Sequence, residues 1–139
     1  MSEIIQVGPL RLEFLASKHE TGGSLDMFRV TLPPTATMPI AHSHRDWEET
    51  FYGLVGVVTV TLEGESRLIG PGETLFVRRG AVHNFHNASD ADATFLSVLT
   101  PGVLGPEYFR ELAAALAGGV PDPALMRQIM ARHGLIPAP

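Results

Sequence analysis

The stretch PIAHSHRDWEETFYGLVG, residues 39–56, decides the fold and the chemistry that this sequence predicts. His42 and His44 lie two residues apart, so on an extended strand both imidazoles face the same side. Glu49 follows five residues later, and this odd offset places it on the opposite face of a regular strand. The polar segment 45–47 must therefore turn or bulge if the three side chains are to meet. Two imidazoles and one carboxylate are ligands typical of a mononuclear transition-metal site.

Three neighbours of these residues leave alternatives open. Glu48 competes with Glu49 for the role of carboxylate ligand. Asp46 and Trp47 either gate the mouth of the site or form a plain turn with a surface tryptophan.

The composition narrows the class of protein. The chain has 139 residues, which favours one domain with one core. The formal net charge is -5, and the lysines and arginines are scattered, so nucleic-acid binding is disfavoured. The sequence has no cysteine, which excludes disulfides and thiolate ligands. We find no secretory signal and no apolar run of about 20 residues, so we expect a cytoplasmic protein with no membrane contact.

The chain up to about Thr100 reads as short strands separated by turns. Its clearest strand is 57–62, and Gly-rich turns such as 70–72 separate it from its neighbours. This pattern predicts an all-β sandwich or barrel. After residue 102 the apolar residues recur at helical spacing, first from Pro106 and then after Asp122, which is a candidate N-cap. We therefore expect a β domain over 1–104 and a helical extension packed on it over 105–139.

A second stretch, GETLFVRRGAVHNFHN at residues 72–87, completes a recognisable pattern. Together the two stretches resemble the cupin superfamily. Its first motif is His-x-His, three or four residues, Glu, six residues and Gly, matched here by His42, His44, Glu49 and Gly56. Its second motif is Gly, five residues, Pro-x-Gly, two residues, His, three residues and Asn, matched by Gly72, Gly80, His83 and Asn87. Arg78 replaces the proline of that motif.

The resemblance implies a six- to eight-stranded antiparallel jelly-roll barrel, also called a double-stranded β-helix, with a short C-terminal helical tail. It also implies four metal ligands, namely His42, His44, Glu49 and His83. The spacing to Gly56 favours Glu49 over Glu48. Such a ligand set suits one divalent Fe, Mn, Ni, Cu or Zn ion and leaves one or two open positions. By analogy with small single-domain cupins we expect a homodimer.

Similar sites most often serve dioxygenases of the quercetin-dioxygenase type, or isomerases and decarboxylases of small acids. The sequence thus predicts a metal-dependent enzyme for a small organic substrate, with Glu49 as general base. A non-catalytic ligand-binding module and a structural dimer with a vestigial metal are the alternatives, because one fold hosts many functions.

Several residues are candidates for secondary roles. The parity of the strands makes Phe51 and Phe85 candidates to line the cavity, with Met27 or Phe28, and Met38, from neighbouring strands. Arg78 or Arg79 is either a clamp for a substrate carboxylate or an ordinary solvated side chain. Three residues of the first helix form a lid, a dimer seam or an ordinary buried face: Tyr108, Phe109 and Leu112. His86 is expected to point away from the site.

Overall fold

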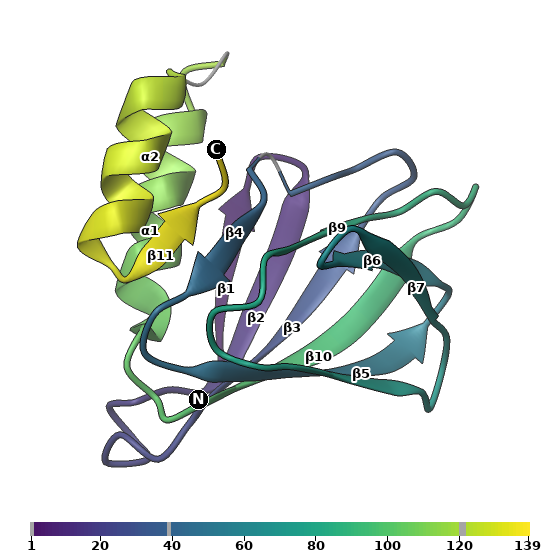
Figure 1. The fold of residues 1–139 in the computed structure, drawn as a ribbon, viewed down its shortest axis with the longest axis horizontal. Helices are drawn as coiled ribbons and strands as arrows, with labels where there is room; N and C mark the ends of the chain where they lie inside the picture. The colour runs from purple at the N-terminus through teal and green to yellow at the C-terminus, as the bar shows by residue number, and fades with distance from the viewer. Residues whose placement is uncertain (1, 39, 120–121) are drawn as a thin grey trace.

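The computed structural model describes residues 2–38, 40–119 and 122–139, so Pro39, with which the first motif stretch begins, lies outside them. Within these residues eleven strands form two sheets, and two helices lie together at one side (Figure 1). The strands are β1 Glu3–Val7, β2 Leu10–Ala16, β3 Asp26–Leu32, β4 His42–His44, β5 Glu48–Val55, β6 Val58–Leu62, β7 Glu65–Ile69, β8 Thr74–Val77, β9 His83–His86, β10 Ala93–Thr100 and β11 Leu135–Pro137. The helices are α1 Gly105–Leu116 and α2 Pro123–Arg132.

The two sheets are antiparallel throughout their named pairings. One has the order β1-β2-β3-β10-β5-β8, and the other has the order β11-β4-β9-β6-β7. Residues alternate between buried and half-exposed along β3 and β10, as a sheet with one face on the core requires. The antiparallel sheets confirm the all-β class. In the described residues the sheets are hydrogen-bonded separately and do not close into one barrel.

The segment between β4 and β5 carries the chain from one sheet to the other. It bends at Arg45 and Asp46, as the offset between His44 and Glu49 predicts. Because the chain changes sheet, the side chains of His44 and Glu49 meet between the two sheets although their sequence offset is odd. Of the two alternatives for residues 46 and 47, the plain turn with a surface tryptophan was wrong, because Trp47 is 1% exposed and its ring stacks on His44 with centroids 4.7 Å apart. Burial of the indole removes a large apolar area from water, although its Nε1 has no hydrogen-bond partner among the described residues.

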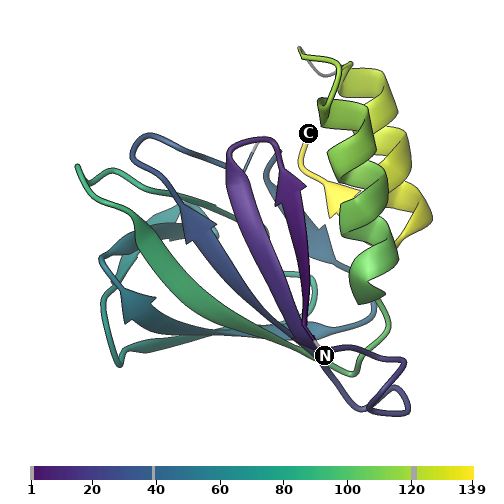
Figure 2. The same cartoon turned by 180° about the vertical axis from the view of Figure 1, so that it is seen from behind.

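The helical tail lies beside β1, as the view from behind shows (Figure 2), and two contacts fix it against the sheets. The buried carboxylate of Asp26, at the start of β3, accepts hydrogen bonds from the backbone N–H groups of Lys18 (2.8 Å) and Gly105 (3.1 Å). A carboxylate at a helix N-terminus is favoured by the helix dipole, so Asp26 holds the start of α1. Phe109 of α1 packs on Phe28 with ring centroids 5.1 Å apart. The division of the chain into a β domain over 1–104 and a helical extension over 105–139 stays a prediction.

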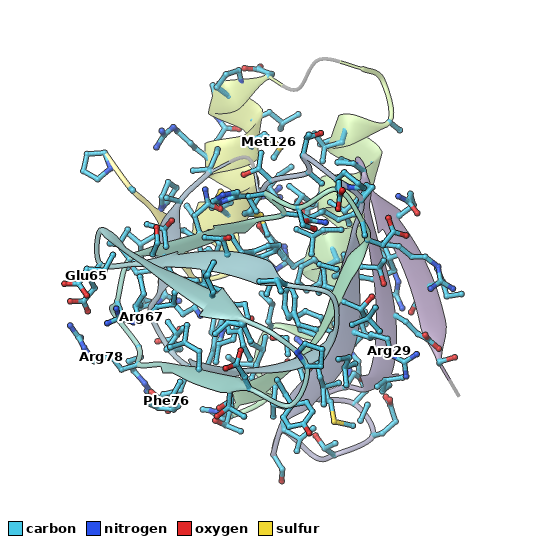
Figure 3. All side chains as sticks on the ribbon, turned by 90° about the vertical axis from the view of Figure 1, so that its right-hand side faces the viewer. Arg29, Glu65, Arg67, Phe76, Arg78 and Met126 are labelled. Carbon is cyan, nitrogen blue, oxygen red and sulfur yellow. The ribbon has the colours of Figure 1, made fainter. Side chains whose placement is uncertain are left out.

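Away from the helices, the structure has an open polar hollow of about 480 Å³ between β6, β7 and β8. Glu65, Arg67, Phe76 and Arg78 lie around it (Figure 3). Among the described residues, no helix is long and apolar enough to cross a bilayer.

Candidate metal centre

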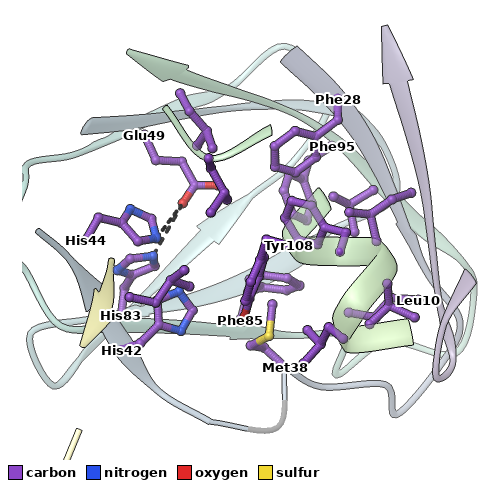
Figure 4. Close-up of a pocket in the computed structure, with 18 residues that line it drawn as sticks. Leu10, Phe28, Met38, His42, His44, Glu49, His83, Phe85, Phe95 and Tyr108 are labelled. Carbon is purple, nitrogen blue, oxygen red and sulfur yellow. Dashed lines mark ion pairs between the residues drawn. The ribbon is translucent and has the colours of Figure 1, made fainter. Parts of the chain in front are cut away.

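The four predicted ligands lie together between the two sheets. His42 and His44 come from β4 and His83 from the adjacent β9, whereas Glu49 comes from β5 of the other sheet (Figure 4). The ligand atoms of the three histidines lie within 4.8 Å of one another. Glu49 Oε1 lies 3.4 Å from His83 Nε2 and 3.8 Å from His44 Nε2. All four residues are at most 7% exposed.

Backbone carbonyls fix the protonation of two imidazoles. His42 Nδ1 donates to the Ile40 carbonyl and His83 Nδ1 to the Ala81 carbonyl, each at 3.0 Å. Because a carbonyl only accepts, each Nδ1 carries the proton and each Nε2 keeps its lone pair when the ring is neutral. This arrangement is typical of metal-binding histidines.

His44 is held differently, because its Nδ1 is buried without a hydrogen-bond partner among the described residues. A buried polar atom without a partner is costly, and so is a cluster of imidazoles without a common ligand. Three imidazoles and one carboxylate with unshared electron pairs therefore fit a divalent transition metal, which all four would hold.

The burial of the site favours the protonation states that bind metal. Burial lowers the pKa of His42 to about 4, with a smaller contribution from the charge of His83. Burial also lowers the pKa of His44 to about 3, although the charge of Glu49 opposes this shift. Both imidazoles are therefore neutral at pH 7, and metal ligation requires neutral imidazole.

The pKa values of Glu49 and His83 shift in the directions expected for an ion pair. Burial acts to raise the pKa of Glu49, but contact with His83 and the charge of His44 outweigh burial and lower it to about 2. Burial acts to lower the pKa of His83, but contact with Glu49 outweighs it and raises that pKa. The carboxylate is therefore ionised at neutral pH, as a metal ligand or a general base must be.

Ser97 is a residue of the site that the sequence argument missed. Its hydroxyl donates to Glu49 Oε2, and the side chain is fully buried on β10, the strand next to β5. The hydroxyl leaves Oε1 free to face the histidines. Ser97 stands at an inward position between Phe95 and Leu99, and a polar residue there was the available signal.

A cavity of about 40 Å³ adjoins the four ligands. Phe85, Phe28 and Met38 line it as predicted, whereas Met27 and Phe51 do not. Phe51 is buried instead against Phe95, with ring centroids 4.8 Å apart. The face of α1 that had three interpretations also lines the cavity, through Tyr108, Phe109 and Leu112.

The other candidates for a metal ligand or a substrate clamp lie outside the cavity. Glu48 turns outward and forms a two-bond ion pair with Arg79, one bond of which is 3.1 Å long. Arg78 pairs with Glu63 at 2.7 Å, so neither arginine lines the cavity. His86 is half-buried and does not belong to the cluster of histidines.

Known proteins resemble this chain in sequence and in fold. A family model described as Cupin domain (Cupin_2) matches residues 28–99. An uncharacterized protein of Aquifex aeolicus is 31% identical over 74 residues, 53% of this chain and 60% of that protein. Quercetin 2,3-dioxygenase of Bacillus subtilis is 31% identical over 87 residues, 63% of this chain but only 25% of the enzyme. The chain thus spans less than two thirds of either relative.

The fold has many counterparts among solved structures. One is the crystal structure of a predicted oxalate decarboxylase from Thermotoga maritima, with a TM-score of 0.65 and 25% identity. The similarity covers 73% of this chain and 92% of that protein. With the family model matched over half of the sequence and the fold shared, the chain belongs to the cupin superfamily.

Proposed function

We propose that this chain is a metal-dependent enzyme of the dioxygenase type that acts on a small organic substrate. One observation carries the proposal: three imidazoles and an ionised carboxylate converge on one wall of a buried apolar cavity. His42, His44, Glu49 and His83 would hold one divalent Fe, Mn, Ni, Cu or Zn ion. Such an ion supplies Lewis-acid or redox chemistry at its open positions. The likeness to quercetin 2,3-dioxygenase supports the reaction type.

Residues of the chain would accept a proton, orient the carboxylate and exclude water. Glu49 would accept a proton from the substrate, since it is ionised and faces the cavity. Ser97 would orient that carboxylate through its hydrogen bond to Oε2. The apolar lining would keep bulk water away and strengthen the electrostatic interactions inside. The two sheets, which enclose one cavity, support the jelly-roll arrangement that the family implies.

A metal-dependent decarboxylase or isomerase is the second candidate. The likeness to a predicted oxalate decarboxylase favours it, because the same four ligands serve either chemistry. A non-catalytic binding module would use the same cavity without turnover.

Metal analysis of the purified protein, followed by oxygen-consumption assays with phenolic and enolic compounds, tests these functions. We expect about one metal ion per chain and oxygen uptake with at least one compound. Substoichiometric metal under every purification condition would contradict the proposal. A protein that is replete with metal but inert to oxygen would favour the decarboxylase, the isomerase or the binding module.

A further inference from the structure

Most of the side chains that line the cavity are apolar. Apart from the four ligands and Tyr108, every described residue that lines it is aliphatic or aromatic, or is the thioether Met38. No lysine or arginine of the described chain reaches it. Arg78 and Arg79 are already paired with Glu63 and Glu48 outside the cavity, and Arg45, next to His44, pairs with Asp46.

This lining restricts the charge of a substrate. A metal ion held by the cluster would neutralise one ionised group of a bound compound. Because Glu49 already balances one charge of a divalent ion, a compound with two negative charges, such as oxalate or a phosphate ester, would leave one charge buried among apolar walls without a partner, and such burial is costly. The walls instead favour a ring or a branched hydrocarbon.

Helix α1 restricts the size of a substrate. Leu112 is 1% exposed and lines the cavity from the side of the tail, outside the segment that matches the family model. The cavity of about 40 Å³ is smaller than the cavity of about 150 Å³ that holds benzene in another protein, so even a single ring needs the lining side chains to move apart. A ligand must therefore be compact, and the side chains of α1 set how much room it has.

Building on the function proposed above, we propose that the centre takes a compact compound with a single chelating head and an apolar body. The head carries at most one negative charge, the body is at most one ring or a branched chain, and Leu112 limits its size. Dianions such as oxalate are excluded by the missing cation, and multi-ring compounds by α1.

Cobalt-loaded protein tests the charge selectivity without any turnover. Maltol, a one-ring hydroxypyranone, and oxalate are titrated against the visible spectrum of the bound Co²⁺. Each affinity is divided by the affinity of that ligand for aqueous Co²⁺, which leaves the contribution of the protein. We expect maltol to exceed oxalate about tenfold or more in this ratio. An equal or reversed ratio overturns the proposed substrate class, while a protein that retains no Co²⁺ overturns the metal site itself.

A matched pair of variants tests the size limit. 3-Hydroxyflavone has the same chelating head as maltol with additional rings, and we expect the unaltered protein to prefer maltol about tenfold or more. Leu112→Ala should reduce this preference about tenfold. Leu116→Ala is the control, because Leu116 lies on the same helix but does not line the cavity. If Leu112→Ala does not fold, Leu112→Val should give a smaller change in the same direction. An unchanged preference in a folded Leu112 variant, or an equal loss in Leu116→Ala, would refute the role of Leu112.

Discussion

Glu48 and Glu49 are adjacent in sequence, but only Glu49 reaches the cavity. Glu49→Gln keeps the shape of the side chain and removes its capacity to accept a proton. We expect turnover to fall about 100-fold or more, and metal content to fall less, because general-base catalysis contributes about 10²–10⁴. Oxygen-uptake rates and metal analysis on the same samples check this. Glu48→Gln is the matched control and should change neither quantity, since Glu48 pairs with Arg79 at the surface. Equal losses of metal and turnover in Glu49→Gln would remove the base role.

Ser97 acts through Glu49, so its removal tests the positioning of the carboxylate. Ser97→Ala takes away the donor to Oε2 and should weaken metal affinity about 10- to 100-fold, as loss of outer hydrogen bonds does elsewhere. Competition titrations of Zn²⁺ against a chromophoric chelator measure this. Thr94→Ala on the same strand is the control, because its hydroxyl bonds to Thr31 away from the site. A change of less than about twofold in Ser97→Ala would show that Glu49 is held by packing alone.

At the scale of residues, the sequence predicted the four side chains that converge, because their motif spacings are specific. It could not predict Ser97, since one serine in an alternating strand has many uses. It also left Trp47 open between the mouth of the site and the surface, because the burial of Trp47 depends on His44 and Gly134. Gly134 has φ +87°, and a Cβ there would lie 3.2 Å from the Trp47 ring. The contact with Gly134 comes from a segment 87 positions away and leaves no local pattern.

At the scale of elements, β4 depends on an unexpected partner. This three-residue strand carries His42 and His44, yet it pairs with β9 at one position only, His42 with His83. On its other side β11 pairs with all three of its residues. Hydrogen bonds from Arg45 N to Gly134 O (3.0 Å) and from Ala138 N to Ala41 O (2.8 Å) flank this pairing. The C-terminal strand therefore holds the ligand strand in place.

Ile136→Pro tests whether β11 positions the ligands. Ile136 faces Ser43, and the alternation of an antiparallel ladder makes this a hydrogen-bonded pair. Proline has no N–H, so this variant should weaken metal affinity about tenfold. Ile136→Thr keeps the N–H, and the side chain is 50% exposed, so this control should bind metal normally. Circular dichroism confirms that both variants fold. Equal affinities of the two variants for Zn²⁺ would contradict the positioning role.

The alternation of apolar residues predicts the central strands but gives no sign of β1 and β11. In β1, Ile4 is 55% exposed and Ile5 is buried, so two adjacent isoleucines hide the alternation. In β11, three residues are too few to show any period, and Pro137 argues against a strand. Pro137 is tolerated because its partner is His42, at a position that does not require its N–H.

At the scale of the whole molecule, the candidate metal centre joins the two sheets. His42, His44 and His83 belong to the five-stranded sheet, and Glu49 belongs to the six-stranded sheet. In the described residues the sheets are not joined to each other by a strand pairing, and a polar hollow opens between them away from the helices. The sequence could predict two layers around a core, but not this separation, because long-range edge pairing has no local signature.

Removal of the metal should therefore loosen the connection between the sheets. A ligand at 100 times its dissociation constant stabilises the folded state by about 2.7 kcal/mol, which for a chain of this size corresponds to roughly 10 °C in Tm. We expect a metal chelator to lower the Tm of the loaded protein by about this amount. Scanning calorimetry with and without chelator measures the shift, and His83→Ala is the control, since it lacks one ligand and should show a much smaller shift. An equal shift in His83→Ala would place the stabilising ion elsewhere, and no shift in the loaded protein would mean that the metal does not hold the two sheets together.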